Sequence, residues 1–164
     1  ELTRRKNQHV IIEALHQLKD PHIKLFICGR GESEAALKAM VNDFGLGDSV
    51  HFLGYRRDIH ELCCAADIFV FTSIQEGLPR ALMEAMANGK AVVCSDIRGN
   101  TDLIDNEKGG FVVPNEPKEV AKAVKVLRAS NKLREEMGNY NMTAVCAFNE
   151  STATEVLHSL ILSV

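Results

Sequence analysis

The segment from Ser73 to Ala87 carries the residues best suited to chemistry, because it places two glutamates beside a strand-to-helix turn. An apolar run ends shortly before Glu76, and a helix is predicted from about Pro79. The Glu76 carboxylate therefore lies in the turn, where it can accept hydrogen bonds from ligand hydroxyls. Backbone amides of residues 77 to 81 face the same space with positive partial charge. A sugar phosphate would satisfy both groups.

The second glutamate, Glu84, lies on this helix but away from the apolar stripe of Leu82, Ala85 and Met86, so it need not be buried. A carboxylate beside a cleft can hold the two vicinal hydroxyls of a ribose. Taken singly, each glutamate is compatible with ordinary surface charge. Their joint position on one strand-to-helix turn favours a binding function.

Three cations, Arg4, Arg5 and Lys6, stand at the start of a helix predicted from about Asn7. The positive end of the helix dipole disfavours cations there, so a compensating anion is expected. A diphosphate is one solution, since Lys6 as a compact charge and the first helix amides could meet its oxygens without a metal. The alternative is a solvated basic patch.

The turn Gly29-Arg-Gly31 resembles a dinucleotide-binding loop, but Glu34 stands where the third glycine of the G-x-G-x-x-G pattern belongs. Two acidic residues here would also repel a pyrophosphate, which disfavours a nicotinamide or flavin cofactor and leaves a simple tight turn as the alternative. The six histidines include no pair spaced i, i+4, so no metal site is predicted.

Composition favours one domain without nucleic acid or membrane partners. The chain has 164 residues, 46% of them hydrophobic, and a net charge of −3 with interspersed acids and bases. Its apolar runs are far shorter than the roughly 20 residues of a membrane-spanning helix. The five cysteines, an odd number, suit buried free thiols in a reducing compartment, the cytoplasm. A start at Glu1 with no leader pattern suggests a boundary within a longer protein.

Helical stripes and fully apolar strands alternate along the chain. Strands are predicted at 24–28, 50–53, 67–72, 91–95 and 109–113, with helices between them and after them. Strands apolar on both faces imply a parallel sheet covered on both sides, in a doubly wound α/β domain. We expect a single domain over 1–164, with a core of 1–150 and a carboxyl-terminal helix over 151–164. Ligands in such folds bind beyond the carboxyl ends of the strands.

The run Glu76-Gly-Leu-Pro79 followed by Glu84-Ala-Met-Ala87 resembles the E-x7-E signature of the family 4 retaining glycosyltransferases, a branch of the group 1 glycosyltransferases. Further matches follow in the family's order at Lys6-Asn7, Gly29-Arg-Gly31, Phe52-Leu-Gly54, Ala66 to Val70 and Ile97 to Ile104, so the resemblance covers nearly the whole chain. It implies the carboxyl-terminal, Rossmann-like half of a GT-B fold. The amino-terminal acceptor domain, absent here, would be its partner.

The resemblance also implies roles for individual residues. As the catalytic residue, Glu76 would contact the donor-sugar hydroxyls and position the sugar without transferring a proton. Glu84 would contact the ribose. Lys6, with Arg5, would bind the diphosphate, and the backbone around Tyr55 and Arg56 would face the base. The implied donor-binding set is Lys6, Arg5, Gly29, Gly31, Tyr55, Arg56, Glu76, Gly77, Leu78, Pro79, Arg80 and Glu84.

Two departures from the family pattern bear on these roles. The family's usual arginine, about five residues before the lysine, aligns with Glu1, and Arg4 or Arg5 is the candidate replacement. The segment Gly99-Asn100 stands where the family often has Gly-Gly.

The implied function is hexosyl transfer from a nucleoside diphosphate sugar to an acceptor hydroxyl with retained anomeric configuration, without metal or cofactor. A UDP-sugar is favoured over a GDP-sugar. The expected setting is polysaccharide or glycolipid synthesis in the cytoplasm. The missing domain could bring the enzyme to the inner face of the membrane. The isolated chain would be inactive. Alternatives are a non-catalytic nucleotide-sugar-binding module and a GT-B sugar-nucleotide epimerase. The sequence does not fix the base, sugar, acceptor or oligomeric state.

Overall fold

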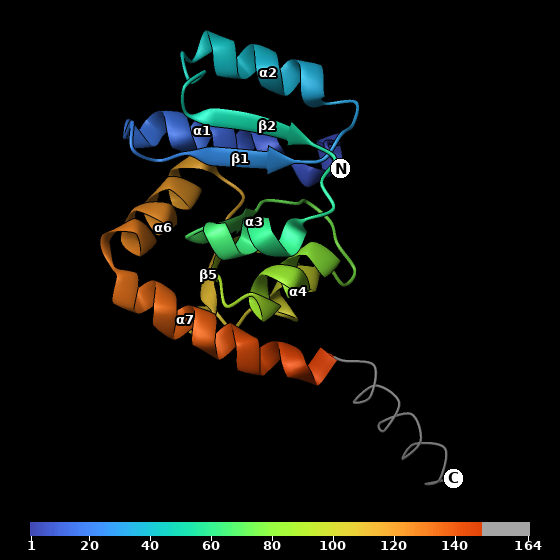
Figure 1. The fold of residues 1–164 in the computed structure, drawn as a ribbon, viewed down its shortest axis with the longest axis vertical. Helices are drawn as coiled ribbons and strands as arrows, with labels where there is room; N and C mark the ends of the chain where they lie inside the picture. Colours follow the sequence, from blue (N-terminus) through green and yellow to red (C-terminus); the bar gives the residue numbers. More distant parts are fainter. Residues whose placement is uncertain (149–164) are drawn as a thin grey trace, which may run out of the picture.

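A computed structural model describes residues 1–148, which fold into parallel strands flanked by helices (Figure 1). The strands are β1 (Leu25–Cys28), β2 (Val50–Gly54), β3 (Ile68–Phe71), β4 (Ala91–Ser95) and β5 (Gly110–Val113). The α-helices are α1 (Gln8–Leu18), α2 (Glu34–Asp43), α3 (Ile59–Ala65), α4 (Arg80–Ala87), α5 (Arg98–Thr101), α6 (Pro117–Ala129) and α7 (Asn131–Ala144). Two 3-10 turns, η1 (Arg4–Lys6) and η2 (Val145–Phe148), complete the described chain. The helix predicted over 151–164 lies outside the described residues.

The strands are all parallel, as predicted, but they form two sheets rather than one. β1 pairs with β2, and β3, β4 and β5 pair in that order. In Figure 1, β1 and β2 point the same way, and the N-terminus lies near their carboxyl ends. The strand predictions rest on local apolar runs, which do not reveal which strands become neighbours.

Helix α1 joins the two parts of the fold. Its buried residues Ile12 and Leu15 belong to a cluster with Leu37, Val41 and other side chains around β1 and β2. Val10 and Ala14, also on α1, pack instead with a cluster of β4 and α6 side chains. One helix therefore contributes to both apolar cores. A third cluster lies under α4 and β4 and fixes the helix that follows Glu76.

The start of the chain differs from the sequence expectation. Arg4, Arg5 and Lys6 were expected at the start of a helix beginning at about Asn7, and they instead form the separate turn η1 just before it. Asn7 then takes a left-handed conformation, with φ of 57°, and α1 begins at Gln8. Asparagine is one of the few residues other than glycine that adopts this conformation readily. The three cations thus stand on their own turn, ahead of the α1 amides.

Candidate functional site

Two of the predicted cations meet the predicted catalytic carboxylate directly. Lys6 Nζ lies 2.7 Å from Glu76 Oε1, and Arg5 Nη1 lies 3.1 Å from the same oxygen. Arg5 also donates a hydrogen bond of 2.8 Å to the carbonyl oxygen of Gln75. The sequence assigned these residues to different parts of a ligand, whereas the structure joins them across 70 positions of the chain. Glu76 is therefore the anion that compensates the basic turn η1.

The ion pair of Lys6 and Glu76 is largely shielded from solvent, so its charges interact strongly. The Glu76 side chain is 9% exposed and that of Lys6 18%. Burial raises the pKa of the Glu76 carboxyl, but the hydrogen bond from Lys6 and the charges of Lys6 and Arg5 outweigh burial, so its pKa lies below the ordinary value. Glu76 is thus ionised at neutral pH and can act only as a hydrogen-bond acceptor.

The loop that carries Glu76 is fixed from below by buried polar groups. Ser95 Oγ donates to the carbonyl oxygen of Ser73, and Asn100 Nδ2 donates to Ser95 at 2.9 Å (carbonyl oxygen) and 3.0 Å (Oγ). Asn100, the departure from Gly-Gly, is fully buried and ties these strand ends together. Sequence reasoning missed this network, since only the fold brings residues 73, 95 and 100 into contact.

Gly99 supports the same loop by being small. A Cβ atom built on Gly99 would lie 2.6 Å from the carbonyl oxygens of both Glu76 and Gly77, a distance that real Cβ atoms do not tolerate. The backbone of the predicted sugar-binding turn therefore rests directly on α5. This contact explains the glycine without invoking a ligand.

Gly29 and Gly31 also have packing partners within the chain. A Cβ on Gly31 would lie 2.2 Å from the carbonyl oxygen of Leu2, and one on Gly29 would lie 3.1 Å from the backbone nitrogen of Glu1. Gly29 further has a φ of 124°, which favours glycine. These glycines let the first residues of the chain cross the end of β1.

The residues predicted to face the base stand beside this crossing. Gly29 N–H donates to the carbonyl oxygen of Gly54, which places Tyr55 and Arg56 next to the Gly29 turn. Tyr55 is 67% exposed, and Arg56 forms an exposed ion pair with Asp58. An exposed aromatic ring at the carboxyl end of a strand is available for stacking on a ligand.

The remaining predicted residues belong to the turn before α4 and to α4 itself. Gly77, Leu78 and Arg80 are exposed, while Pro79 is buried at the position just before the helix. Glu84 is exposed, as its place off the apolar stripe predicted. Within residues 1–148, no hydrogen bond or ion pair links the Glu84 side chain to the Lys6 and Glu76 cluster.

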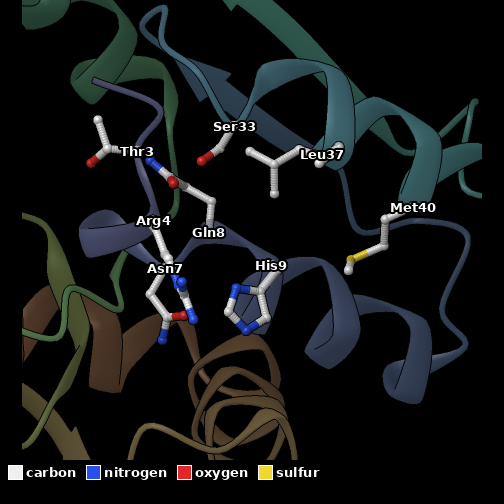
Figure 2. Close-up of a pocket in the computed structure, with 9 residues that line it drawn as sticks. Thr3, Arg4, Asn7, Gln8, His9, Ser33, Leu37 and Met40 are labelled. Atoms are coloured by element: carbon white, nitrogen blue, oxygen red, sulfur yellow. The ribbon is translucent and has the colours of Figure 1, made fainter.

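A separate hollow of about 240 Å³ lies between the start of α1 and the side of α2 (Figure 2). It is lined by Thr3, Arg4, Asn7, Gln8, His9, Ser33, Ala36, Leu37 and Met40. Apart from Arg4, sequence reasoning assigned no site role to these residues, because they belong to three segments that no motif connects. In the part of the chain that the structure describes, Thr3 Oγ1 and Gln8 Oε1 are buried without hydrogen-bond partners.

Neither a metal-binding cluster nor a membrane-spanning helix is found among residues 1–148. Residues 1–148 contain no group of three or more His, Cys, Asp or Glu side chains arranged to hold a metal ion. None of the helices in that part of the chain is both long and apolar enough to cross a membrane.

Comparison with known proteins decides the family. The family model described as "Glycosyl transferases group 1" matches residues 1–143. The chain belongs to this family. The resemblance inferred from Glu76 and Glu84 is confirmed at this level, as is the Rossmann-like half of a GT-B fold.

Curated relatives within the family are biosynthetic glycosyltransferases. The chain is 30% identical over 158 residues to the putative glycosyltransferase EpsD of Bacillus subtilis, covering 94% of this chain and 42% of that protein. It is 30% identical over 161 residues to the lipopolysaccharide core biosynthesis glycosyltransferase LpsE of Rhizobium meliloti, covering 97% of this chain and 47% of that protein. The chain thus spans less than half the length of these two relatives.

Solved structures of similar proteins share the fold of this chain. The crystal structure of HepE from Anabaena in complex with UDP gives a TM-score of 0.92 at 26% identity, covering 100% of this chain and 47% of HepE. The HepE complex with UDP-glucose gives 0.85 at 29% identity, covering 97% of this chain and 47% of that one. TarM from S. aureus, crystallised with UDP among other ligands, gives 0.90 at 25% identity, covering 99% of this chain and 34% of TarM.

Proposed function

We propose that this domain binds a nucleoside diphosphate sugar, preferably a UDP-sugar, as the donor-binding half of a retaining hexosyltransferase. The observation that carries the proposal is the cluster of Lys6, Arg5 and Glu76 at the carboxyl ends of the strands, where parallel α/β folds bind ligands. The similar HepE structures were solved in complex with UDP and with UDP-glucose, which supports the choice of ligand. Polysaccharide or glycolipid synthesis is the proposed setting.

The diphosphate would exchange partners with Glu76. Without a ligand, Glu76 is the counter-ion of Lys6. A diphosphate beside η1 would supply two negative charges to Lys6 and Arg5, so that Glu76 becomes available to the hydroxyls of the sugar. The α4 N-terminus would add backbone amides to the same phosphates. Glu84 would hold the ribose, and Tyr55 with the Arg56 backbone would face the base.

This arrangement suits a reaction with a charged leaving group. In the transfer, the bond between the anomeric carbon and the diphosphate oxygen breaks and its electron pair stays on that oxygen. The acceptor oxygen bonds to the anomeric carbon, and the acceptor's proton passes to the departing diphosphate. Negative charge grows on the diphosphate, and fixed cations already aimed at it stabilise that charge without further reorganisation. Ionised Glu76 would hold the sugar as it gains positive charge. We propose that a further domain would bind the acceptor, and we expect residues 1–164 alone to be inactive.

A titration tests donor binding directly. If, as proposed, a second domain supplies the other wall of the cleft, UDP should bind residues 1–164 with a dissociation constant of roughly 0.1 to 1 mM, detectable from amide shifts near residues 6, 56 and 77. GDP should bind more weakly. If no nucleoside diphosphate shifts these resonances, the domain is not a donor-binding domain.

Two glutamate variants separate recognition of the sugar from recognition of the nucleotide. Glu76→Gln should weaken UDP-glucose severalfold and leave bare UDP unchanged or tighter, because Lys6 loses its internal counter-ion. Glu84→Gln should weaken both ligands, since both carry the ribose. Calorimetry with the two ligands against both variants gives the comparison. Equal losses of UDP and UDP-glucose in the Glu76 variant would contradict its role as a sugar contact.

A further inference from the structure

The segment that follows β3 holds the backbone of η1 through two hydrogen bonds whose donors were not predicted as site residues. Thr72 Oγ1 donates to the Asn7 carbonyl oxygen at 3.0 Å, and Ile74 N–H donates to the Arg5 carbonyl oxygen at 2.9 Å. Asn7 follows Lys6 in the chain, and Arg5 precedes it. The backbone of Lys6 is therefore fixed on both sides by the end of β3, the strand that leads into the turn before α4.

Thr72 is itself firmly anchored. It is 1% exposed, and its carbonyl oxygen accepts a hydrogen bond of 2.8 Å from Asn115 Nδ2. The residue before it, Phe71, pairs with Cys94 in the ladder between β3 and β4. Threonine is branched at Cβ, which restricts the rotamers open to its side chain. Because the sheet and Asn115 fix Thr72, its hydroxyl can hold η1 in place.

The Thr72 hydroxyl bonds to a residue whose backbone conformation is uncommon. Asn7 has a φ of 57°, in the left-handed region, and its side chain makes no capping hydrogen bond to α1. Residues other than glycine keep such a conformation where the surrounding structure constrains it. The backbone dihedrals of Asn7 set the direction in which η1 leaves the start of α1. The bond from Thr72 therefore helps to fix where η1, and with it Lys6, lies.

The same strand end also contacts the Lys6 side chain, since Lys6 Nζ lies 5.1 Å from the centre of the Phe71 ring, within the range of a cation–π contact. We propose that Thr72 is a positioning residue for Lys6, whose buried hydroxyl keeps the Lys6 ammonium group directed at Glu76 and at the space where a diphosphate would bind. This role rests on the proposed function, because it affects donor binding only if Lys6 binds the diphosphate.

The Thr72 bond would matter most once the donor is bound. In the proposed exchange, the diphosphate replaces Glu76 as the partner of Lys6, so the internal ion pair no longer positions the ammonium group. The bond from Thr72 to Asn7 involves no charged side chain and is unaffected by this exchange. A cation held in this way needs little reorganisation as charge grows on the leaving group. Thr72 would therefore keep Lys6 in place during the transfer.

The first test needs no ligand, so its failure is distinct from a failure of donor binding. Thr72→Val and Thr72→Ala both remove the hydroxyl, whereas Thr72→Ser keeps it, and circular dichroism checks that each variant folds. The pKa of the Glu76 carboxyl, measured by carbon-13 NMR titration, reports on Lys6 and Arg5, the cations that face it within residues 1–148. This pKa should rise by about 0.5 or more in the two hydroxyl-free variants and change by less than about 0.2 in Thr72→Ser. An unchanged pKa in both hydroxyl-free variants would overturn the proposal.

The second test is the affinity for UDP, measured from amide shifts in two backgrounds. In the native chain, Thr72→Val should weaken UDP by about three- to tenfold, and Thr72→Ser by less than about twofold. In a chain that already carries Lys6→Met, Thr72→Val should weaken UDP by less than about twofold further, because the cation that it positions is gone. An equal loss in both backgrounds would show that Thr72 acts on the fold in general and would refute its role toward Lys6. If UDP binds none of these chains, the proposed function fails, and the Glu76 titration still decides the role of Thr72.

Discussion

The ion pair between Lys6 and Glu76 should contribute measurably to the stability of the unliganded domain. Two unit charges 2.7 Å apart attract with about 3 kcal/mol at an effective dielectric constant of about 40. Desolvation and the ordering of the lysine side chain reduce this value, and Arg5 remains near Glu76 when Lys6 is replaced. We therefore expect a coupling free energy of about 1 to 2 kcal/mol.

A double-mutant cycle of Lys6→Met and Glu76→Gln isolates this coupling from the other effects of each substitution. Urea unfolding followed by circular dichroism gives the free energy of unfolding of all four proteins. With a urea m-value of roughly 2 kcal/mol/M, a coupling of this size corresponds to a midpoint shift of roughly 0.5 to 1 M. Because both side chains are largely buried, salt should screen their attraction only weakly and reduce the coupling modestly.

The chain offers a matched control in the pair Lys38 and Glu34. Their charged atoms lie 2.6 Å apart, but the side chains are 52% and 30% exposed on α2. A cycle of Lys38→Met and Glu34→Gln should give about 0.3 to 0.5 kcal/mol, the usual value for an exposed i, i+4 pair. If the Lys6 and Glu76 cycle gives no more than this control, shelter from solvent does not strengthen the cluster and our reasoning is wrong.

Three further predictions concern other features of the domain. The lowered pKa of Glu76 means that its stabilising effect is complete above the ordinary glutamate pKa of about 4.3 and is lost as pH falls through the folded-state value; Glu76→Gln should flatten this part of the acid unfolding curve. Gly31→Ala should cost about 2 kcal/mol or more in urea unfolding, because its Cβ meets backbone, whereas Gly47→Ala, in open space, should change stability by less than about 1 kcal/mol. Burial raises the pKa of the Cys94 thiol to about 12, so iodoacetamide at pH 8 should label exposed Cys64 and spare Cys94, as peptide mass spectrometry would show.

The sequence predicted the elements of the fold well, because apolar periodicity and turn residues act locally. The strand Ala91–Ser95 has the predicted bounds, and β1 and β5 each begin one residue later than predicted. The pairing of the strands was not predicted, since it depends on neighbours far apart in the chain. On α1, the apolar spacing of Val10, Ile11, Ala14, Leu15 and Leu18 predicts the buried stripe, and the structure buries Ile12 in place of Ile11.

For the candidate site, the sequence predicted the residue types but not their contacts. Glu76 and Lys6 were each singled out, yet their ion pair spans 70 positions and leaves no local signal. Asn100 was noted as a departure from the family pattern, and only the fold shows that it supports the strand ends. Gly31 remains a predicted ligand contact, and the fold adds a packing reason for it, because a Cβ there would meet the backbone of Leu2.

The anchored loop around Glu76 has a consequence for the kinetics of ligand capture. Ser95 and Asn100 fix its base, Arg5 bonds to the Gln75 carbonyl oxygen, and Gly99 lies against its backbone. A loop already held at four places has little conformational freedom left to lose, so binding requires no slow ordering step. Stopped-flow association of UDP should then show a single phase that is linear in ligand concentration. A second, slower phase with residues 1–164 would show that this loop remodels on binding.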